Sequence, residues 1–217
     1  MITRRTWMTV LAGSALALAS CQTAPPPMVR PAAFTPLGVS APYLSGDVIG
    51  GHRARAAKIR AAKIRPIPPA MASAYMARLD RELRQQTAGI GLDVLNLGGS
   101  IVIRIPATFT FDTGSSSVKP QTDATLLEIA RTVKTMNQTF VDVLAHTDTT
   151  GTPQGNLALS EKRAAAVATY LAAHGVAKGR IASHGLGESV PLYNPDETET
   201  QRAANRRIEI RLVPYLG

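Results

Sequence analysis

Residues 141–171 read VDVLAHTDTTGTPQGNLALSEKRAAAVATYL, and this stretch decides the fold. Apolar residues alternate with others over 141–146, which predicts a short strand buried mostly on one face of a sheet. After a turn, Thr152 is a suitable N-cap and Pro153 is tolerated in the first helical turn. A helix is therefore expected from Pro153, with apolar side chains at helical spacing and Gly175 at its end.

Opposite charges flank the junction between this strand and this helix. Asp148 follows the strand, and Arg163 lies fifteen residues later on the predicted helix. Open α/β sheets bind ligands at the carboxyl ends of their strands, so the two side chains are candidates to face one ligand. Spacing alone favours a simpler interpretation, in which the two are a structural ion pair or two unrelated surface charges.

Residues in this stretch and on either side of it match a known pattern. The matching positions are Thr147, Asp148, Gly151, Asn156, Leu159, Ser160, Arg163, Ala164, Val167 and Leu171, with Phe111, Asp112, Val118 and Pro120 before them and Asn205, Arg206, Arg207, Ile208, Glu209 and Ile210 after them. In this order they resemble the OmpA-like peptidoglycan-binding domain over about residues 100–214. Ala145 stands where that family usually has Gly, a difference expected to affect strand packing more than the ligand groups.

The resemblance implies a ligand and a role for each site residue. The ligand is the stem peptide of peptidoglycan, whose meso-diaminopimelate has a free zwitterionic centre. Asp148 would bind its ammonium, and Arg163 would bind its carboxylate through the planar guanidinium fork. Asn156 and Arg206 would add hydrogen bonds, and the Phe111–Asp112 pair would form the other wall of the pocket.

The net charge of +9 over 217 residues is concentrated near the N-terminus. Residues 53–65 carry six cations, whereas residues 66–217 carry 15 Lys and Arg against 14 Asp and Glu. A nearly neutral globular part argues against nucleic acid as a partner, because phosphate binding needs a basic face on the folded domain.

The first 20 residues have the pattern of a signal peptide, with Arg4 and Arg5 before a short apolar run. Leu18–Cys21 resembles a bacterial lipobox, which would make Cys21 the lipidated first residue of the mature protein, and several acyl chains on one residue anchor stably. Gln22 resembles the sorting residue of outer-membrane lipoproteins. We therefore expect a lipid-anchored outer-membrane protein with its domain in the periplasm. The Arg pair leaves open whether export is twin-arginine or general secretory.

Residues 21–70 are expected to form a tether. Pro and Ala dominate residues 23–45 and favour an extended spacer. The basic run 53–65 repeats the pentad RAAKI, and its cations spread around a helical wheel without an apolar stripe, so we expect a solvated segment. A functional reading of this run is electrostatic contact with anionic phospholipid headgroups.

The remaining pattern predicts an α/β (α+β) fold with alternating elements, one mixed sheet and helices on one face. Residues 71–98 would hold a helix and the first strand of a hairpin around Gly98 and Gly99, and 99–217 the OmpA-like domain. A helix is expected after Pro120, and further strands over 181–185 and 207–213.

Catalytic and metal-binding readings are less well supported. Asp112 begins a DTGS run like that of aspartic proteases, but that chemistry needs two such carboxylates and this chain would have to act as a homodimer. The histidines show no metal-ligand spacing, and no Ser lies in a GxSxG turn. We therefore expect a binding module with no enzyme activity, cofactor or metal. The alternative is a structural envelope protein that acts mainly through protein partners.

Overall fold

The computed structural model describes residues 48–90 and 92–217. The predictions about the signal peptide, Cys21 and the Pro/Ala-rich spacer concern residues outside this part of the chain. No helix in the described part combines the length and apolar character that a membrane span requires.

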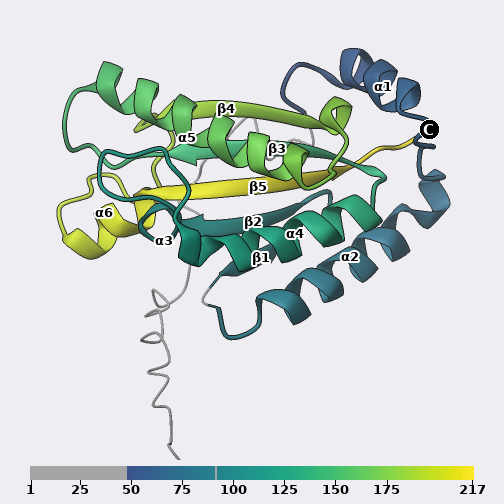
Figure 1. The fold of residues 1–217 in the computed structure, drawn as a ribbon, viewed down its shortest axis with the longest axis horizontal. Helices are drawn as coiled ribbons and strands as arrows, with labels where there is room; N and C mark the ends of the chain where they lie inside the picture. Colours follow the sequence, from purple (N-terminus) through teal and green to yellow (C-terminus); the bar gives the residue numbers. More distant parts are fainter. Residues whose placement is uncertain (1–47, 91) are drawn as a thin grey trace, which may run out of the picture. The chain divides into compact units, whose positions relative to one another are not determined.

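A five-stranded mixed sheet with strand order β1-β2-β5-β3-β4 lies at the centre of the fold (Figure 1). Its strands are β1 (Asp93–Asn96), β2 (Ile101–Pro106), β3 (Thr139–His146), β4 (Ile181–Gly187) and β5 (Arg207–Pro214). β3 and β4 run parallel, and the other neighbouring strands run antiparallel. The α/β fold class predicted from the sequence is confirmed.

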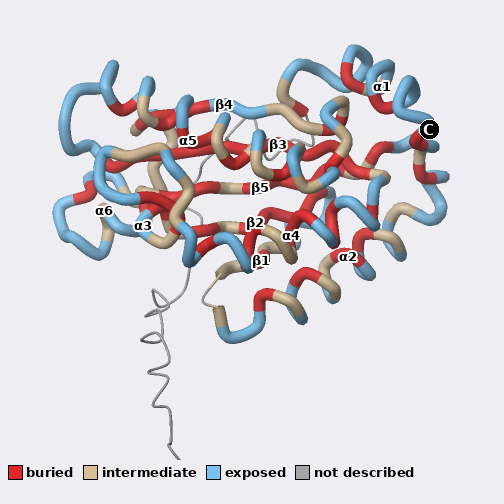
Figure 2. The backbone as a smooth tube through the Cα atoms, viewed as in Figure 1, coloured by how far each residue is buried: buried red, intermediate tan, exposed pale blue. Residues whose placement is uncertain are grey.

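Three long helices cover one face of this sheet, as predicted: α2 (Ala72–Thr87), α4 (Asp123–Thr135) and α5 (Pro153–Ala173). Ile210 pairs with Ile103 on one side and Val143 on the other, and all three are fully buried beneath the helices. Figure 2 shows buried positions along the strands and along the sheet-facing side of each helix. The shorter elements are α3 (Ala107–Thr110), α6 (Glu199–Asn205) and the 3-10 turns η1 (Pro69–Met71), η2 (Pro120–Thr122) and η3 (Lys178–Arg180).

Local signals correctly placed the hairpin and the start of α5. The hairpin between β1 and β2 turns at Gly98, which has a φ of 79° that favours glycine. The Thr152 hydroxyl accepts a hydrogen bond from the amide of Gly155 at 3.1 Å and so caps α5. Gly175, with a φ of 93°, follows the end of this helix as expected.

The expectation of a solvated basic segment is confirmed for five of its six cations and is wrong for Arg55. Residues His52–Ala61 form helix α1, and two of its side chains, Arg55 and Ile59, are buried. The Arg55 guanidinium donates to the Asp142 carboxylate on β3 and to the carbonyl of Arg180, and its carbon Cζ lies 5.2 Å from the centroid of the Phe140 ring. Because the cations are spread around the helix, the sequence pattern did not reveal that Arg55 and Ile59 face inward together.

The burial of β3 also differs from the prediction of one buried face. All eight of its residues are buried. Residues on the face away from α4 and α5 include Phe140 and Asp142, and α1 covers this end of the strand. A second apolar cluster holds α1 there and consists of Val48, Ile59, Ile64, Phe140, Val213 and Tyr215.

Candidate functional site

Asp148 lies just beyond the carboxyl end of β3, where the sequence places it, and is 7% exposed. One carboxylate oxygen, Oδ1, accepts a hydrogen bond from the amide of Thr150 at 3.1 Å. The other, Oδ2, accepts from Nη1 of Arg206 at 2.5 Å. Arg206 thus brings a cation from the start of β5 to the same carboxylate.

Arg206 is held between two acids. Its Nη2 donates to the carboxylate of Glu199 on α6, while Nη1 donates to Asp148. Burial by itself lowers the pKa of Arg206, but the hydrogen bonds to Glu199 and Asp148 outweigh this and raise it. The same contact with Arg206, together with Arg202, lowers the pKa of Glu199.

Arg163 on α5 is buried and faces the loop that follows α3. Its Nε donates to the carbonyl of Ser115 at 2.8 Å, and its Nη2 donates to the carbonyl of Asp112 at 3.2 Å. Its Cζ lies 5.2 Å from the centroid of the Phe111 ring, in cation–π range. The remaining nitrogen, Nη1, makes no hydrogen bond to any described residue.

Asp148 and Arg163 lie near each other but do not form an ion pair within the described part of the chain. Burial lowers the pKa of Arg163, the nearby charge of Arg206 lowers it further, and Asp148 opposes both effects. The site therefore holds an anion and a cation separately, each oriented by other groups. The purely structural ion pair considered from the sequence is absent among the described residues.

Asn156, one turn into α5, connects the helix to the strand ends. Its side-chain nitrogen Nδ2 donates to the carbonyl of Asp148 at 3.2 Å and to Glu188 Oε2 at 2.7 Å. Both acceptors lie just beyond strands, since Asp148 follows β3 and Glu188 follows the parallel strand β4. Asn156 thus orients the Asp148 backbone and brings a second carboxylate to the same edge of the sheet.

The two predicted wall residues contribute in different ways. Phe111 is buried and packs its ring against Arg163. The side chain of Asp112 is 77% exposed and pairs with Lys119 Nζ at 3.1 Å. The backbone carbonyl of Asp112, not its carboxylate, reaches Arg163, and the exposed carboxylate lacks the buried setting of a protease dyad.

The sequence interpretation gave no role to four residues that lie at this site: Ser115, Thr147, Glu188 and Glu199. The Thr147 hydroxyl is buried next to Asp148 and has no hydrogen-bond partner among the described residues. Thr147 and Glu188 follow β3 and β4, so the rule that parallel strands end at one edge provided a signal for both. Nothing local marked the Ser115 carbonyl or Glu199.

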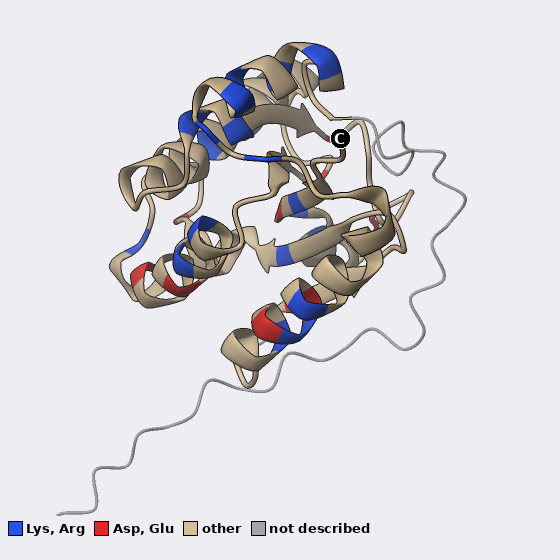
Figure 3. Ribbon diagram, turned by 90° about the vertical axis from the view of Figure 1, so that its right-hand side faces the viewer, with Lys and Arg blue, Asp and Glu red and all other residues tan. Residues whose placement is uncertain are grey.

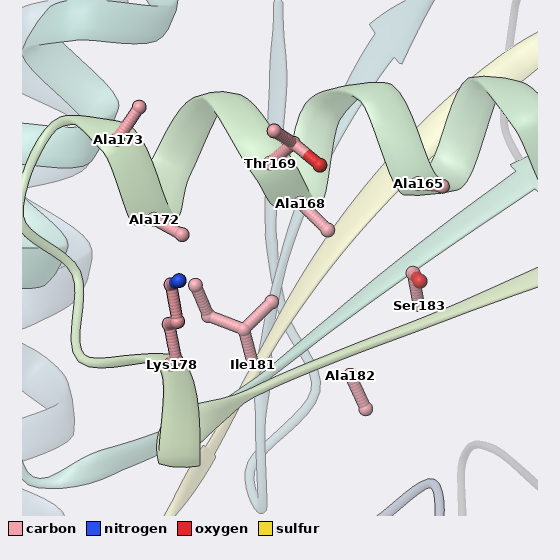
Figure 4. Close-up of a pocket in the computed structure, with 9 residues that line it drawn as sticks. All are labelled: Ala165, Ala168, Thr169, Ala172, Ala173, Lys178, Ile181, Ala182 and Ser183. Carbon is pink, nitrogen blue, oxygen red and sulfur yellow. The ribbon is translucent and has the colours of Figure 1, made fainter.

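A groove of about 610 Å³ lies between α5 and β4, away from these charges (Figure 4). Small side chains line it, with Lys178 at one end and no carboxylate. The groove therefore has no carboxylate that could bind the ammonium of a zwitterion. In residues 48–90 and 92–217, no cluster of His, Cys, Asp and Glu is arranged to hold a metal ion.

Comparison with known proteins finds relatives of similar sequence. The sequence model described as the OmpA family matches residues 110–206. The chain is 37% identical over 140 residues to the probable lipoprotein YiaD of Escherichia coli strain K12, covering 64% of each chain. It is 34% identical over 128 residues to the peptidoglycan-associated lipoprotein of Pseudomonas putida, covering 57% of this chain and 76% of that protein. It matches only 59% of the outer membrane protein A of Bordetella avium.

Comparison with solved structures finds proteins of the same fold. The cell wall anchor of the T6SS from Pseudomonas aeruginosa superimposes with a TM-score of 0.57 and 28% identity, covering 63% of this chain and 97% of that one. A putative MotB like protein from Desulfovibrio vulgaris superimposes with a TM-score of 0.60 and 23% identity. The match covers 66% of this chain and 96% of that one, and it shows that the two share the fold. Because the family match spans the site from Phe111 to Arg206, and this chain covers most of the Pseudomonas putida lipoprotein at 34% identity, it belongs to the OmpA family.

Proposed function

We propose that this protein binds peptidoglycan without catalysis and recognises the free zwitterionic centre of meso-diaminopimelate in the stem peptide. Membership of the OmpA family supports this function, because relatives carry the names peptidoglycan-associated lipoprotein and cell wall anchor. The observation that carries the proposal is the placement of Asp148 and Arg163 at one edge of the sheet. Each side chain is oriented by other groups, and the two are not paired with each other.

In this proposal Asp148 binds the ligand ammonium. Its Oδ2 is paired with Arg206, whose side chain is partly exposed and also paired with Glu199. The ammonium therefore competes with an internal cation for the carboxylate. Arg206, once displaced, is still beside the site and can donate to the ligand carboxylate or to Glu199.

Arg163 binds the ligand carboxylate. Its Nε and Nη2 are engaged by loop carbonyls, and its ring contact with Phe111 fixes the plane of the guanidinium. Nη1 then points its N–H groups at the ligand without a rotamer search, which lowers the entropic cost of binding. Asn156 and Thr147 supply further polar groups beside Asp148.

The proposed localisation follows from Cys21. A lipidated Cys21 would place the domain in the periplasm, anchored to the outer membrane, and the protein would link that membrane to the wall non-covalently. Replacing Cys21 by Ala should move the protein out of the outer-membrane fraction. Retention there as tight as for the parent would contradict the lipid anchor but not the wall-binding site.

Calorimetry with two purified muropeptides tests the site, using the full chain with Cys21→Ala. L-Lysine in place of diaminopimelate keeps the ammonium but removes the carboxylate and leaves Arg163 unpaired. Unpairing a buried charge costs about 2 to 5 kcal/mol, so the lysine muropeptide should bind more than tenfold more weakly.

Three variants assign the roles. Arg163→Ala should lose most of the discrimination between the two muropeptides, and Asp148→Ala should weaken both. Lys162→Ala, an exposed neighbour of Arg163, is the matched control and should bind like the parent. Equal affinity of the parent for both muropeptides, with Asp148→Ala and Arg163→Ala still binding normally, would reject the site assignment.

A further inference from the structure

The basic helix α1 and the residues just after it form a surface that the proposed wall-binding site does not use. Its members are the exposed cations Arg53, Lys58, Arg60, Lys63 and Arg65, and we call them the α1 cations. None of them forms an ion pair within the described part of the chain. No Asp or Glu occurs between residues 48 and 79, and in Figure 3 the charged positions of α1 are all Lys or Arg.

Packing fixes the direction in which these cations face. Arg55 and Ile59 are one helical turn apart and both point inward, to Asp142 and to the second apolar cluster. Arg53 and Arg60 therefore lie on the outer side of α1. Between the cations stand exposed alanines, Ala54, Ala57, Ala61 and Ala62, which let a flat surface approach the helix closely.

The α1 cations lie at the opposite end of the sheet from the wall-binding site. Arg55 is held by Asp142, the fourth residue of β3, whereas Asp148 follows the end of this strand. Asp148 follows Asp142 by six residues, most of them in β3, so the two aspartates are separated by at most roughly 20 Å. Figure 1 shows the same arrangement, with α1 at one end of the strands and α6 at the other.

We propose that the α1 cations bind the anionic headgroups of a phospholipid bilayer while the opposite end of the domain faces the wall. Charge complementarity favours this partner. Val48, four residues before α1, is buried in the cluster that holds this helix, so the backbone that precedes α1 in the sequence connects to the domain beside this surface. The contact needs no acyl chain, and it therefore goes beyond the proposed lipid anchor.

The composition of the surface favours lipid over nucleic acid. Single-stranded nucleic acid is usually bound by exposed aromatic side chains interleaved with cations. The segment 48–70 has alanines between its cations. Its only aromatic ring, that of His52, packs edge-on against Phe140 with 5.0 Å between the ring centroids.

Vesicle sedimentation tests the proposal with the full chain carrying Cys21→Ala, so that no acyl group contributes. Vesicles of equal parts phosphatidylglycerol and phosphatidylethanolamine are compared with phosphatidylcholine vesicles, which report any apolar contribution of the leader. The test variant replaces four α1 cations by Gln: Arg53, Lys58, Arg60 and Lys63. The control variant loses the same net charge from α2, α4 and α5 by replacing Arg81, Arg84, Arg131 and Lys162 with Gln.

The parent should bind the anionic vesicles at low salt and release them at high salt. The test variant should bind them at least about tenfold more weakly, since each cation near an anionic surface contributes a several-fold gain in affinity. The control variant should stay within about twofold of the parent, because its cations lie away from the surface that contacts the bilayer. Both variants should keep the parent's binding to purified sacculi.

Three results would overturn the proposal: undiminished binding of the test variant to anionic vesicles, an equal loss in the control variant, or tighter binding of the parent to a single-stranded oligonucleotide than to anionic vesicles. Failure of the parent to bind sacculi would count against the proposed function alone.

Discussion

The guanidinium of Arg55 reaches across 87 residues of sequence to the carboxylate of Asp142, which is fully buried. Asp142 also accepts from Arg211 Nη2 at 2.9 Å, so one buried anion holds helix α1 and strand β5 together. Arg55 is consequently a structural residue within a run of exposed cations.

Arg55→Ala should destabilise the domain by about 3 kcal/mol, because it leaves part of a buried carboxylate without its partner. Urea denaturation followed by circular dichroism measures this change. Arg53→Ala, an exposed cation two residues away, should alter the free energy of unfolding by less than about 0.5 kcal/mol. Equal effects of the two variants would mean that the Arg55–Asp142 contact does not hold α1.

Arg206→Ala should change the selectivity of the wall-binding site. It frees Asp148 from its internal cation, so the lysine muropeptide should bind about two- to fivefold more tightly, in line with the energy of a partly exposed ion pair. The diaminopimelate muropeptide should not gain, because Arg206 also supports the ligand carboxylate. Arg202→Ala is the matched control, since Arg202 contacts Glu199 but not Asp148. Calorimetry measures the affinity for each muropeptide. If the ratio of the two affinities is the same in Arg206→Ala as in the parent, Arg206 and the ligand ammonium do not compete for Asp148.

Acid should destabilise the fold through His146. Burial, with the nearby charge of Arg207, lowers the pKa of His146 to about 3, opposed by Glu209. Between its ordinary pKa of 6.5 and about 3, the unfolded chain binds a proton that the folded chain does not, so stability falls as pH decreases. From pH 6.5 to 4.5 this loss is on the order of 2 kcal/mol.

Thermal unfolding measured between pH 7.5 and 4.5 checks this prediction. His146→Gln should flatten the dependence in that window, although its stability at pH 7.5 can differ from the parent's. Glu209 acts at lower pH: burial raises its pKa, but Arg207 and His146 lower it to about 2, so its contribution is lost only below about pH 4.5. A parent protein equally stable at pH 6.5 and 4.5 would refute the role of His146.

Gly185 should tolerate no side chain. A Cβ at this position of β4 would lie 2.2 Å from the backbone nitrogen of Glu161 on α5, and backbone atoms there cannot move aside. Gly185→Ala should cost at least about 2 kcal/mol of stability. A Cβ at Gly99 would meet no atom within 4 Å, and the φ of Gly99 is not left-handed, so Gly99→Ala should stay within about 0.5 kcal/mol of the parent. Equal melting temperatures for the two variants would contradict the close approach of α5 and β4.

Elements with local signals were predictable from the sequence. The hairpin needed Gly98, and α5 needed the Thr152 cap and a regular apolar spacing. Helix α6 was not predicted, although Thr198 and Gln201 form a capping box that the sequence displays. The family pattern also identified residues that meet at the edge of the sheet, because those residues are themselves positions of the pattern.

The sequence by itself determined the α/β class, the three long helices and the identity of the charged residues near the site, since caps, turns and apolar periodicity act over a few residues. The tertiary structure alone decided the partner of each charge. Arg206 meets Asp148 across 58 residues, and Arg55 meets Asp142 across 87, which no local pattern encodes. Such pairings depend on strand order and on which face of a helix is covered, and those are set only when the whole sheet assembles.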